Sequence, residues 1–237
     1  ARLRGQGQLT ELRAPDLSFT LEETAEFLIE IMRLSLSIED IAALEKRTEG
    51  WPVGLQLAAL SLQGCDDIRG FIQAFAGDNR YILDYLIEEV LRRQPKKVRS
   101  FLVQTSILDR LNGPLCEAVS GQCHGQAMLN RLERANLFTV PLDNGRHWYR
   151  YHHLFVDSLR AYLHQTQPGR ASELHRRACV WYANHGLAPE AVGHGLMAEE
   201  FELASRLIEQ AAPRMFASGE ITLLLSWLQE LPDGQVS

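Results

Sequence analysis

Two adjacent histidines, His152 and His153, are the residues of this chain best suited to chemistry. They stand in the stretch "WYRYHHLFVDSL", between an aromatic, strand-like run and an amphipathic helix. An imidazole can bind a metal ion, transfer a proton near neutral pH or hydrogen-bond a phosphate. Consecutive residues point about 100° apart on a helix and to opposite faces of a strand, so we expect the two rings to diverge rather than to grip one metal. The simplest interpretation is one histidine in the core and one exposed.

No other cluster of residues indicates catalysis. Cys116, Cys123 and His124 suggest a metal site, but their spacing fits no zinc module. The chain contains no GxxxxGK[ST], GxGxxG, HExxH or GxSxG motif, which removes the usual routes to nucleotide hydrolysis and acyl transfer. The chain by itself is therefore predicted not to be an enzyme, to have no catalytic residue and to hold no metal.

Composition and charge are those of an ordinary globular protein. The 237 residues are 46% hydrophobic and 23% charged, with a formal net charge of -6. This acidic balance argues against a large nucleic-acid surface. No apolar run approaches the ~18 residues of a membrane span, and the first residues lack the apolar core of a signal peptide. We expect a cytoplasmic protein without a membrane partner.

The elements that must position His152 begin with a strand and a group of helices. "QLTELRA", residues 8–14, alternates polar and apolar residues as a short strand does. Two capping boxes then predict helix starts, Thr20 with Glu23 and Ser37 with Asp40.

The stretch "EGWPVGL" separates the second of these helices from a third. Gly50 suits a left-handed C-terminal cap, and Pro52 suits the first turn of a helix that is apolar on most faces. In the absence of other information, the end of one helix and the start of the next explain both residues.

The middle of the chain has the outline of a winged-helix domain. Short helical runs precede two β-prone arms around a turn at Asp143, Asn144 and Gly145, and the predicted helices are 80–93, 95–106, 113–120, 127–136 and 154–165. The helix at 127–136 is the one that a winged-helix protein would use as its DNA-recognition helix, and it contains Arg131 and Arg134. Glu133 and the acidic total argue against that role.

After residue 166 the chain is predicted to form short amphipathic helices with tight Gly or Pro connections. Such helix pairs tend to stack into a solenoid. The predicted fold class is mainly α: a helical region, a winged-helix domain with a small β-hairpin, and an α-helical arm or repeat region.

The order of several stretches resembles the MalT-like group of LuxR-family transcriptional regulators, which are signal-transducing ATPases of the STAND class. The resemblance rests on "GQLTELRAPDLSFTLEETAEFL", "TEGWPVGLQLAALSL", "YILDYLIEEVLRRQP", "VRSFLVQTSIL" and "YRYHHLFVDSLRAYL", and continues more weakly into "LLLSWLQELP". It implies an internal fragment of a longer protein. Residues 1–15 would end a nucleotide-binding domain, 16–64 would form a helical lid, 65–165 a winged-helix domain, and 166–237 an arm with the first helical repeats.

The resemblance also assigns three cofactor-binding residues. Gly50 and Pro52 match the family's GxP motif, whose proline packs against the adenine. "YHHL" lies in register with the Met-His-Asp motif of related ATPases, which places His152 at the β-phosphate of ADP. His153 replaces the aspartate of that motif, so its role stays open.

These resemblances favour the regulatory middle segment of an ATP/ADP-switched transcriptional activator. Its expected partners are the nucleotide-binding domain before it, a sensor domain after it, a small-molecule inducer and further copies of itself. DNA would be bound only through a C-terminal domain, and the fragment alone would hold no nucleotide. A self-contained winged-helix and helical-repeat module for protein interaction is the alternative, and a His-dependent metalloenzyme is a weaker one.

Overall fold

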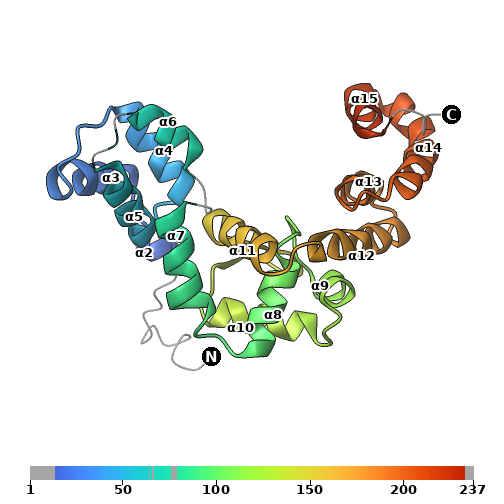
Figure 1. Cartoon of the computed structure of the whole chain (residues 1–237), viewed down its shortest axis with the longest axis horizontal. Coiled ribbons are helices and arrows are strands. Elements are labelled where there is room, and N and C mark those ends of the chain that lie inside the picture. The colour runs from blue at the N-terminus through green and yellow to red at the C-terminus, as the bar shows by residue number, and fades with distance from the viewer. Residues whose placement is uncertain (1–13, 64, 66, 76–78, 233–237) are drawn as a thin grey trace. The chain divides into compact units, whose positions relative to one another are not determined.

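The computed structural model describes residues 14–63, 65, 67–75 and 79–232, most of which are helical (Figure 1). The chain divides into two compact units, Ala1–Leu86 and Ile87–Ser237. The mainly α fold class is confirmed. The strand predicted at 8–14 lies outside the described residues, apart from Ala14, which begins a helix.

The first unit is a group of short helices. In chain order they are α2 (Ala14–Leu17), α3 (Leu21–Glu26), the π-helical η1 (Phe27–Ile31), α4 (Ile38–Thr48), α5 (Pro52–Leu62), α6 (Ile68–Ala74) and α7 (Arg80–Tyr85). The π-helical η2 (Leu86–Leu91) follows α7 directly and belongs to the second unit from Ile87 on. α4 packs against α3, α5 and α6, and α5 packs against α7.

Both predicted capping boxes are present in this unit. Thr20 and Glu23 exchange side-chain and backbone hydrogen bonds of 2.8 and 3.2 Å at the start of α3. Ser37 and Asp40 do the same at the start of α4. Each box satisfies two backbone N–H groups that the first helical turn leaves without a partner. The local sequence therefore sets where both helices begin.

The second unit opens with a winged helix. Its helices are α8 (Lys96–Thr105), α9 (Gly113–Ser120), α10 (Gly125–Arg134) and α11 (His153–Thr166), and its strands are β1 (Thr139–Pro141) and β2 (Tyr149–Tyr151). The strands pair antiparallel, with Val140 opposite Arg150. A bridge between Leu111 and Tyr149, with N–O distances of 2.8 and 2.9 Å, ties the hairpin to the segment between α8 and α9.

The wing is longer than a two-residue hairpin. Leu142 donates its backbone N–H to the Trp148 carbonyl at 2.8 Å. The Asp143 carboxylate accepts the backbone N–H groups of His147 at 3.1 Å and Trp148 at 2.7 Å, and these bonds lower the pKa of Asp143. The predicted turn residues therefore lie at the tip of a wider loop that one aspartate holds closed.

The arm follows as α12 (Arg170–Asn184), α13 (Ala188–Met197), α14 (Phe201–Ser218) and α15 (Ile221–Glu230) (Figure 1). Each helix packs against the next, and α12 also packs against α9 and α11 of the winged helix. A buried cluster holds α13 to α15 together and contains Val192, Leu196, Ala204, Ile208, Ala211, Met215, Leu224, Trp227 and Leu231. The helical arm predicted after the winged helix is thus present.

No helix in the described part of the chain combines the length and the apolar character needed to cross a membrane.

Candidate functional site

The backbone between α4 and α5 takes a conformation that requires glycine at position 50. Glu49 ends α4 with φ 51°, and Gly50 continues the left-handed turn with φ 67°. The Gly50 carbonyl accepts a 2.8 Å hydrogen bond from the Phe19 backbone N–H. A Cβ atom at Gly50 would lie 2.3 Å from the Phe19 carbonyl oxygen. Any side chain there would therefore push two backbone segments apart.

This turn delivers Pro52 to the first position of α5. Trp51 is the N-cap, with φ -66° and ψ 114°, and supplies no side-chain cap. Its indole packs against the Tyr85 ring at a centroid distance of 6.2 Å and lies directly over Gly54. Proline is well placed at the start of a helix because its missing N–H would have no helical partner. The Pro52 ring is half-buried, so an apolar edge stays accessible.

In the second unit, His152 lies at the junction between β2 and α11. Its backbone N–H donates to the Phe138 carbonyl at 2.7 Å, which continues the hairpin by one bond. Its own carbonyl accepts from Phe155 at 3.0 Å and Val156 at 2.9 Å, which begins the helix. His152 is thus the N-cap of α11, with ψ 136°, although no side-chain hydrogen bond caps the helix.

An aromatic cluster surrounds the His152 ring, which is 8% exposed. Phe138 meets the imidazole edge to face at 6.1 Å and stacks on Phe155 at 4.9 Å. Tyr151 contacts Phe155 edge to face at 6.0 Å, and its hydroxyl is 2.8 Å from Thr105 Oγ1 in α8. Phe138 itself has φ 51°, an unusual value for a phenylalanine. Phe138, from the segment before β1, therefore packs directly against the imidazole, and Phe155 supports Phe138.

The rings of His152 and His153 do not diverge, and the expectation that they would was wrong. They stack at a centroid distance of 4.7 Å with planes 17° apart. The two residues belong neither to one strand nor to one helix, because His152 has extended backbone and His153 is the first helical residue. Neither regular periodicity applies across such a junction.

The three residues predicted to bind nucleotide lie in different units. Gly50 and Pro52 are in the first unit and His152 is in the second. Within the first unit the structure brings Gly50 and Pro52 together at one helix junction.

A second histidine pair, which sequence reasoning missed, lies between α12 and α13. His175 Nδ1 and His194 Nδ1 are 2.7 Å apart, so one ring donates a proton and the other accepts. The Tyr182 ring stacks on His194 at 5.3 Å. Burial, helped by nearby positive charge, lowers the pKa of both histidines to about 4. No spacing rule links residues on two helices, so the sequence carried no signal for this pair.

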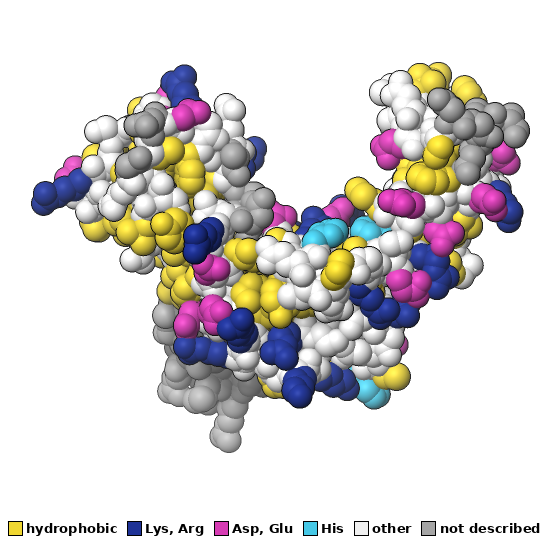
Figure 2. Space-filling model, in the orientation of Figure 1, with side chains coloured by type: hydrophobic (Ala, Val, Ile, Leu, Met, Phe, Trp, Pro, Cys, Tyr) yellow, Lys and Arg dark blue, Asp and Glu magenta, His cyan; other side chains and the backbone are white. Residues whose placement is uncertain are grey.

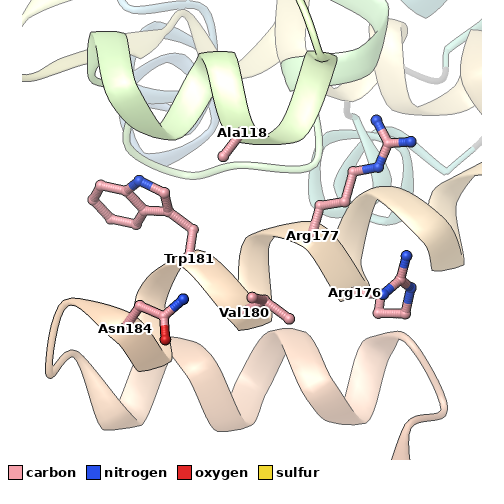
Figure 3. A pocket seen from close by; sticks show the side chains of 6 residues that line it. All are labelled: Ala118, Arg176, Arg177, Val180, Trp181 and Asn184. Carbon is pink, nitrogen blue, oxygen red and sulfur yellow. The ribbon is translucent and has the colours of Figure 1, made fainter.

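A pocket of about 280 Å³ lies between α9 and α12 and is lined by Ala118, Arg176, Arg177, Val180, Trp181 and Asn184. Figure 3 shows the Trp181 ring and the Arg177 side chain reaching from α12 toward α9. Both arginines donate to the Glu173 carboxylate at 2.8–3.0 Å, which lowers the pKa of Glu173 to about 2. Both guanidinium groups share the one Glu173 carboxylate, so this cluster keeps a net positive charge of one.

Comparison with known proteins identifies the domain that carries His152. Residues 87–171 match the model of the MalT winged helix domain. The chain is 35% identical over 235 residues to the serine/threonine-protein kinase PknK of Mycobacterium tuberculosis (strain ATCC 25618 / H37Rv), covering 99% of this chain and 21% of that protein. It is 32% identical over 234 residues to the HTH-type transcriptional regulator MalT of Klebsiella pneumoniae subsp. pneumoniae, covering 98% of this chain and 26% of the regulator.

The chain is MalT-like. The MalT of Vibrio cholerae serotype O1 is also similar, with 31% identity over 245 residues, 100% of this chain and 26% of the regulator. The chain spans 21–26% of the length of these relatives, so the kinase or regulator activity in their names belongs to much longer proteins.

The MalT winged helix domain begins close to the division between the two units. The match starts at residue 87, and the second unit starts at Ile87. The match ends at residue 171, within the first turn of α12. The boundaries predicted at 15/16, 64/65 and 165/166 stay predictions.

Proposed function

We propose that this MalT-like chain is the regulatory middle segment of an ATP/ADP-switched transcriptional activator, which couples nucleotide state to inducer sensing and self-association. One observation carries the proposal: His152 stands at the start of α11, at the end of the hairpin of a MalT winged helix domain. The relatives named as HTH-type transcriptional regulators support a regulatory setting. The chain itself would contribute no catalytic step.

In this proposal His152 hydrogen-bonds a phosphate of bound ADP. Two features of the junction suit an anion: an imidazole nitrogen donor and the N-terminus of a 14-residue helix that has no side-chain cap. Phe138 packs against the imidazole and is itself stacked on Phe155, which would restrict the rotamers of the His152 ring. A donor fixed in advance loses little entropy when it binds.

Gly50 and Pro52 would act on the adenine side of the nucleotide. Gly50 sets the turn, because only glycine fits beside the Phe19 carbonyl. That turn presents the half-buried Pro52 ring as a flat apolar surface with no N–H group of its own. The Pro52 ring in the first unit therefore suits a purine, and, taken separately, the His152 imidazole in the second unit suits a phosphate.

An ADP contact from His152 would make a latch, because it would form only when the winged helix closes on the nucleotide-binding domain. Loss of this contact would favour the open, active arrangement. The nucleotide-binding domain that supplies the remaining contacts is expected ahead of residue 16.

The test is ADP binding to the protein that includes this nucleotide-binding domain, measured by calorimetry on wild type and His152→Ala. A lost phosphate hydrogen bond of about 1–3 kcal/mol would weaken ADP binding by about 5- to 150-fold. The conservative variant His152→Asn keeps a donor and should retain part of the affinity. His147→Ala is the matched control, because His147 lies in the wing with an 81% exposed side chain.

Unchanged ADP affinity in a folded His152→Ala protein would contradict the latch and return His152 to a packing role. The circular dichroism spectrum of the variant decides whether it is folded. A parent reading frame without a phosphate loop ahead of the lid would contradict the nucleotide switch altogether.

The arm favours one alternative, a module for protein interaction. Several large apolar side chains of α13 to α15 are exposed, namely Met197, Phe216, Ile221, Leu223 and Leu225. Such residues mark interaction surfaces when they are contiguous. This alternative needs no phosphate loop, so the same reading frame distinguishes it from the nucleotide switch.

A further inference from the structure

We propose that the outer face of α10 and the adjacent wing bind the phosphate backbone of double-stranded DNA. This surface belongs to the MalT winged helix domain and does not depend on the nucleotide switch. The interaction would be additional to any DNA-binding domain elsewhere in the protein.

The charge of this domain differs in sign from that of the chain. Residues 87–171 contain twelve Lys and Arg against seven Asp and Glu, a formal charge of +5, whereas the whole chain carries -6. Figure 2 shows Lys and Arg side chains gathered over the part of the second unit that contains α8 and α10. The acidic total that argued against nucleic acid therefore comes from the segments outside the winged helix.

The exposed face of α10 carries a shallow groove of about 540 Å³ with a basic rim. Its lining residues are Ala127, Asn130, Arg131, Arg134 and Ala135. Arg131 and Arg134 are three positions apart on one helix face, both are exposed, and neither forms an ion pair with another residue of the described chain. The small side chains of Ala127 and Ala135 flank the two arginines, so no bulky side chain of the groove lining covers them from either end.

Glu133, which also argued against DNA, is turned toward the wing. Its carboxylate accepts from Arg146 at 3.1 Å and from the Tyr149 hydroxyl at 3.4 Å, and its side chain is 18% exposed. It does not line the groove. The acidic residue in this helix therefore serves the α10–wing contact and leaves the outer face basic.

The wing is held beside α10 and extends the basic surface. Gln126 Nε2 donates to the Arg146 carbonyl at 3.1 Å, which joins the wing to the first turn of α10. The Arg146 side chain is 57% exposed despite its bond to Glu133, and the neighbouring His147 is 81% exposed. The shape of this surface is complementary to double-stranded DNA. The helix would lie along one groove, and the wing would contact the adjacent phosphate backbone.

Nucleic acid fits this surface better than an acidic protein does. A protein interface has an apolar centre with buried aromatic or aliphatic anchors. All of residues 87–171 are described, and Leu142 is the only large apolar residue among them whose side chain is exposed. It does not line the groove. A surface of arginines over alanines has no such anchor, but it suits a partner held by phosphate charges.

Binding of the 237-residue chain to a fluorescent 20-base-pair duplex, followed by anisotropy over a range of salt concentrations, tests the proposal. The double variant Arg131→Gln/Arg134→Gln should bind every sequence more weakly. It should also reduce the slope of log affinity against log salt by about 2, because each lost phosphate contact contributes about 1. Arg206→Gln/Arg214→Gln, on α14, is the matched control, since it removes two exposed arginines outside the winged helix.

Absence of salt-dependent binding, or equal binding by the two double variants, would overturn the proposal. Arg131 and Arg134 also lie in the last turn of α10, where cations stabilise the helix dipole. Thermal unfolding of both variants therefore accompanies the binding curves, and equal melting temperatures exclude a folding explanation. Tighter binding to poly-glutamate than to the duplex would replace DNA by an acidic protein partner.

Discussion

The junction at Gly50 and the junction at His152 each begin a helix, but different interactions hold the two junctions in place. Each starts a helix, α5 or α11, whose N-cap residue supplies no side-chain hydrogen bond. At Gly50 the junction is held by the backbone: a left-handed turn, a missing Cβ and a proline at the first helical position. At His152 it is held by the packing of side chains from α8, from the end of β2 and from the segment before β1.

The difference shows what each junction tolerates. A turn fixed by backbone sterics fails on the addition of one carbon atom, whereas a junction fixed by an aromatic cluster loses stability in proportion to the contacts removed. The units also differ in titratable groups, because all eight histidines of the chain lie in the second unit. A decrease in pH should therefore change the stability of the two units to different extents.

The largest effect is expected from Gly50→Ala. The new Cβ would overlap the Phe19 carbonyl, and alanine disfavours the left-handed conformation, so the first unit should lose about 2–3 kcal/mol of unfolding free energy. Urea denaturation gives the free energy, and hydrogen exchange resolved by peptide should place the loss in residues 16–62.

Gly193→Ala is the matched control in the second unit. Gly193 lies inside α13, and no atom lies within 4 Å of the position that its Cβ would take. The same chemical change should stabilise the protein there by about 0.5–1 kcal/mol. A Gly50→Ala protein as stable as wild type would show that Phe19 moves away freely, and the contrast between the junctions would disappear.

Acid should destabilise the second unit before the first. The pKa of His175 and of His194 is about 4 in the folded protein, below the ordinary value of 6.5, so the unfolded chain binds more protons between these values. Stability should be complete above about pH 6.5 and fall as the pH decreases toward 4. Discounted for partial exposure, the loss from pH 7 to pH 5 should be about 1–2 kcal/mol.

Hydrogen exchange at pH 7 and pH 5, corrected for the intrinsic rate, should show the loss at α12 and α13. His194→Gln should flatten the pH dependence, because it removes one of the two titrating rings. Nearby Asp109 opposes the pKa shift in both histidines, while Arg160, which forms an ion pair with Asp109 at 2.8 Å, reinforces it. Equal sensitivity of the first unit, which contains no histidine, would assign the acid effect to carboxylates instead.

The last prediction, Tyr151→Phe, probes the cluster around His152 and is expected to have an effect no larger than that of acid. The Tyr151 hydroxyl is buried against Thr105 Oγ1, whose own proton goes to the Phe101 carbonyl at 2.8 Å. Removing the hydroxyl should cost about 1–2 kcal/mol and leave the aromatic stack in place. Tyr81→Phe, at a side chain 55% exposed, is the control and should be neutral. A neutral Tyr151→Phe in thermal unfolding would show that the stack alone holds the junction.

Much of the fold could be predicted because its signals are local. Capping boxes at Thr20 and Ser37, the glycine and proline around Trp51 and the turn residues Asp143 to Gly145 act within a few positions along the chain. The winged helix followed from the order of such signals. The length of the wing did not, because it depends on Asp143 bonding the backbone of residues 147 and 148.

The candidate site was predictable only in part. His152 was found because it is adjacent to His153, yet the parallel stacking of the two rings was not foreseen. The His175–His194 pair was not predicted, since its members are 19 positions apart in the sequence and lie on two different helices, α12 and α13. The orientation of Glu133 could not be predicted either, because its partners, Arg146 and Tyr149, lie on the wing.

By itself the sequence determined which residues end and begin the helices, that the chain is mainly helical around one winged helix, and that residues 87–171 are basic within an acidic chain. These properties depend on backbone sterics, short-range hydrogen bonds and composition. Only the tertiary structure decided which imidazoles meet, that Glu133 leaves the outer face of α10, and that aromatic rings fix His152. Those outcomes depend on contacts between residues far apart in the chain, whose geometry exists only once the helices have packed.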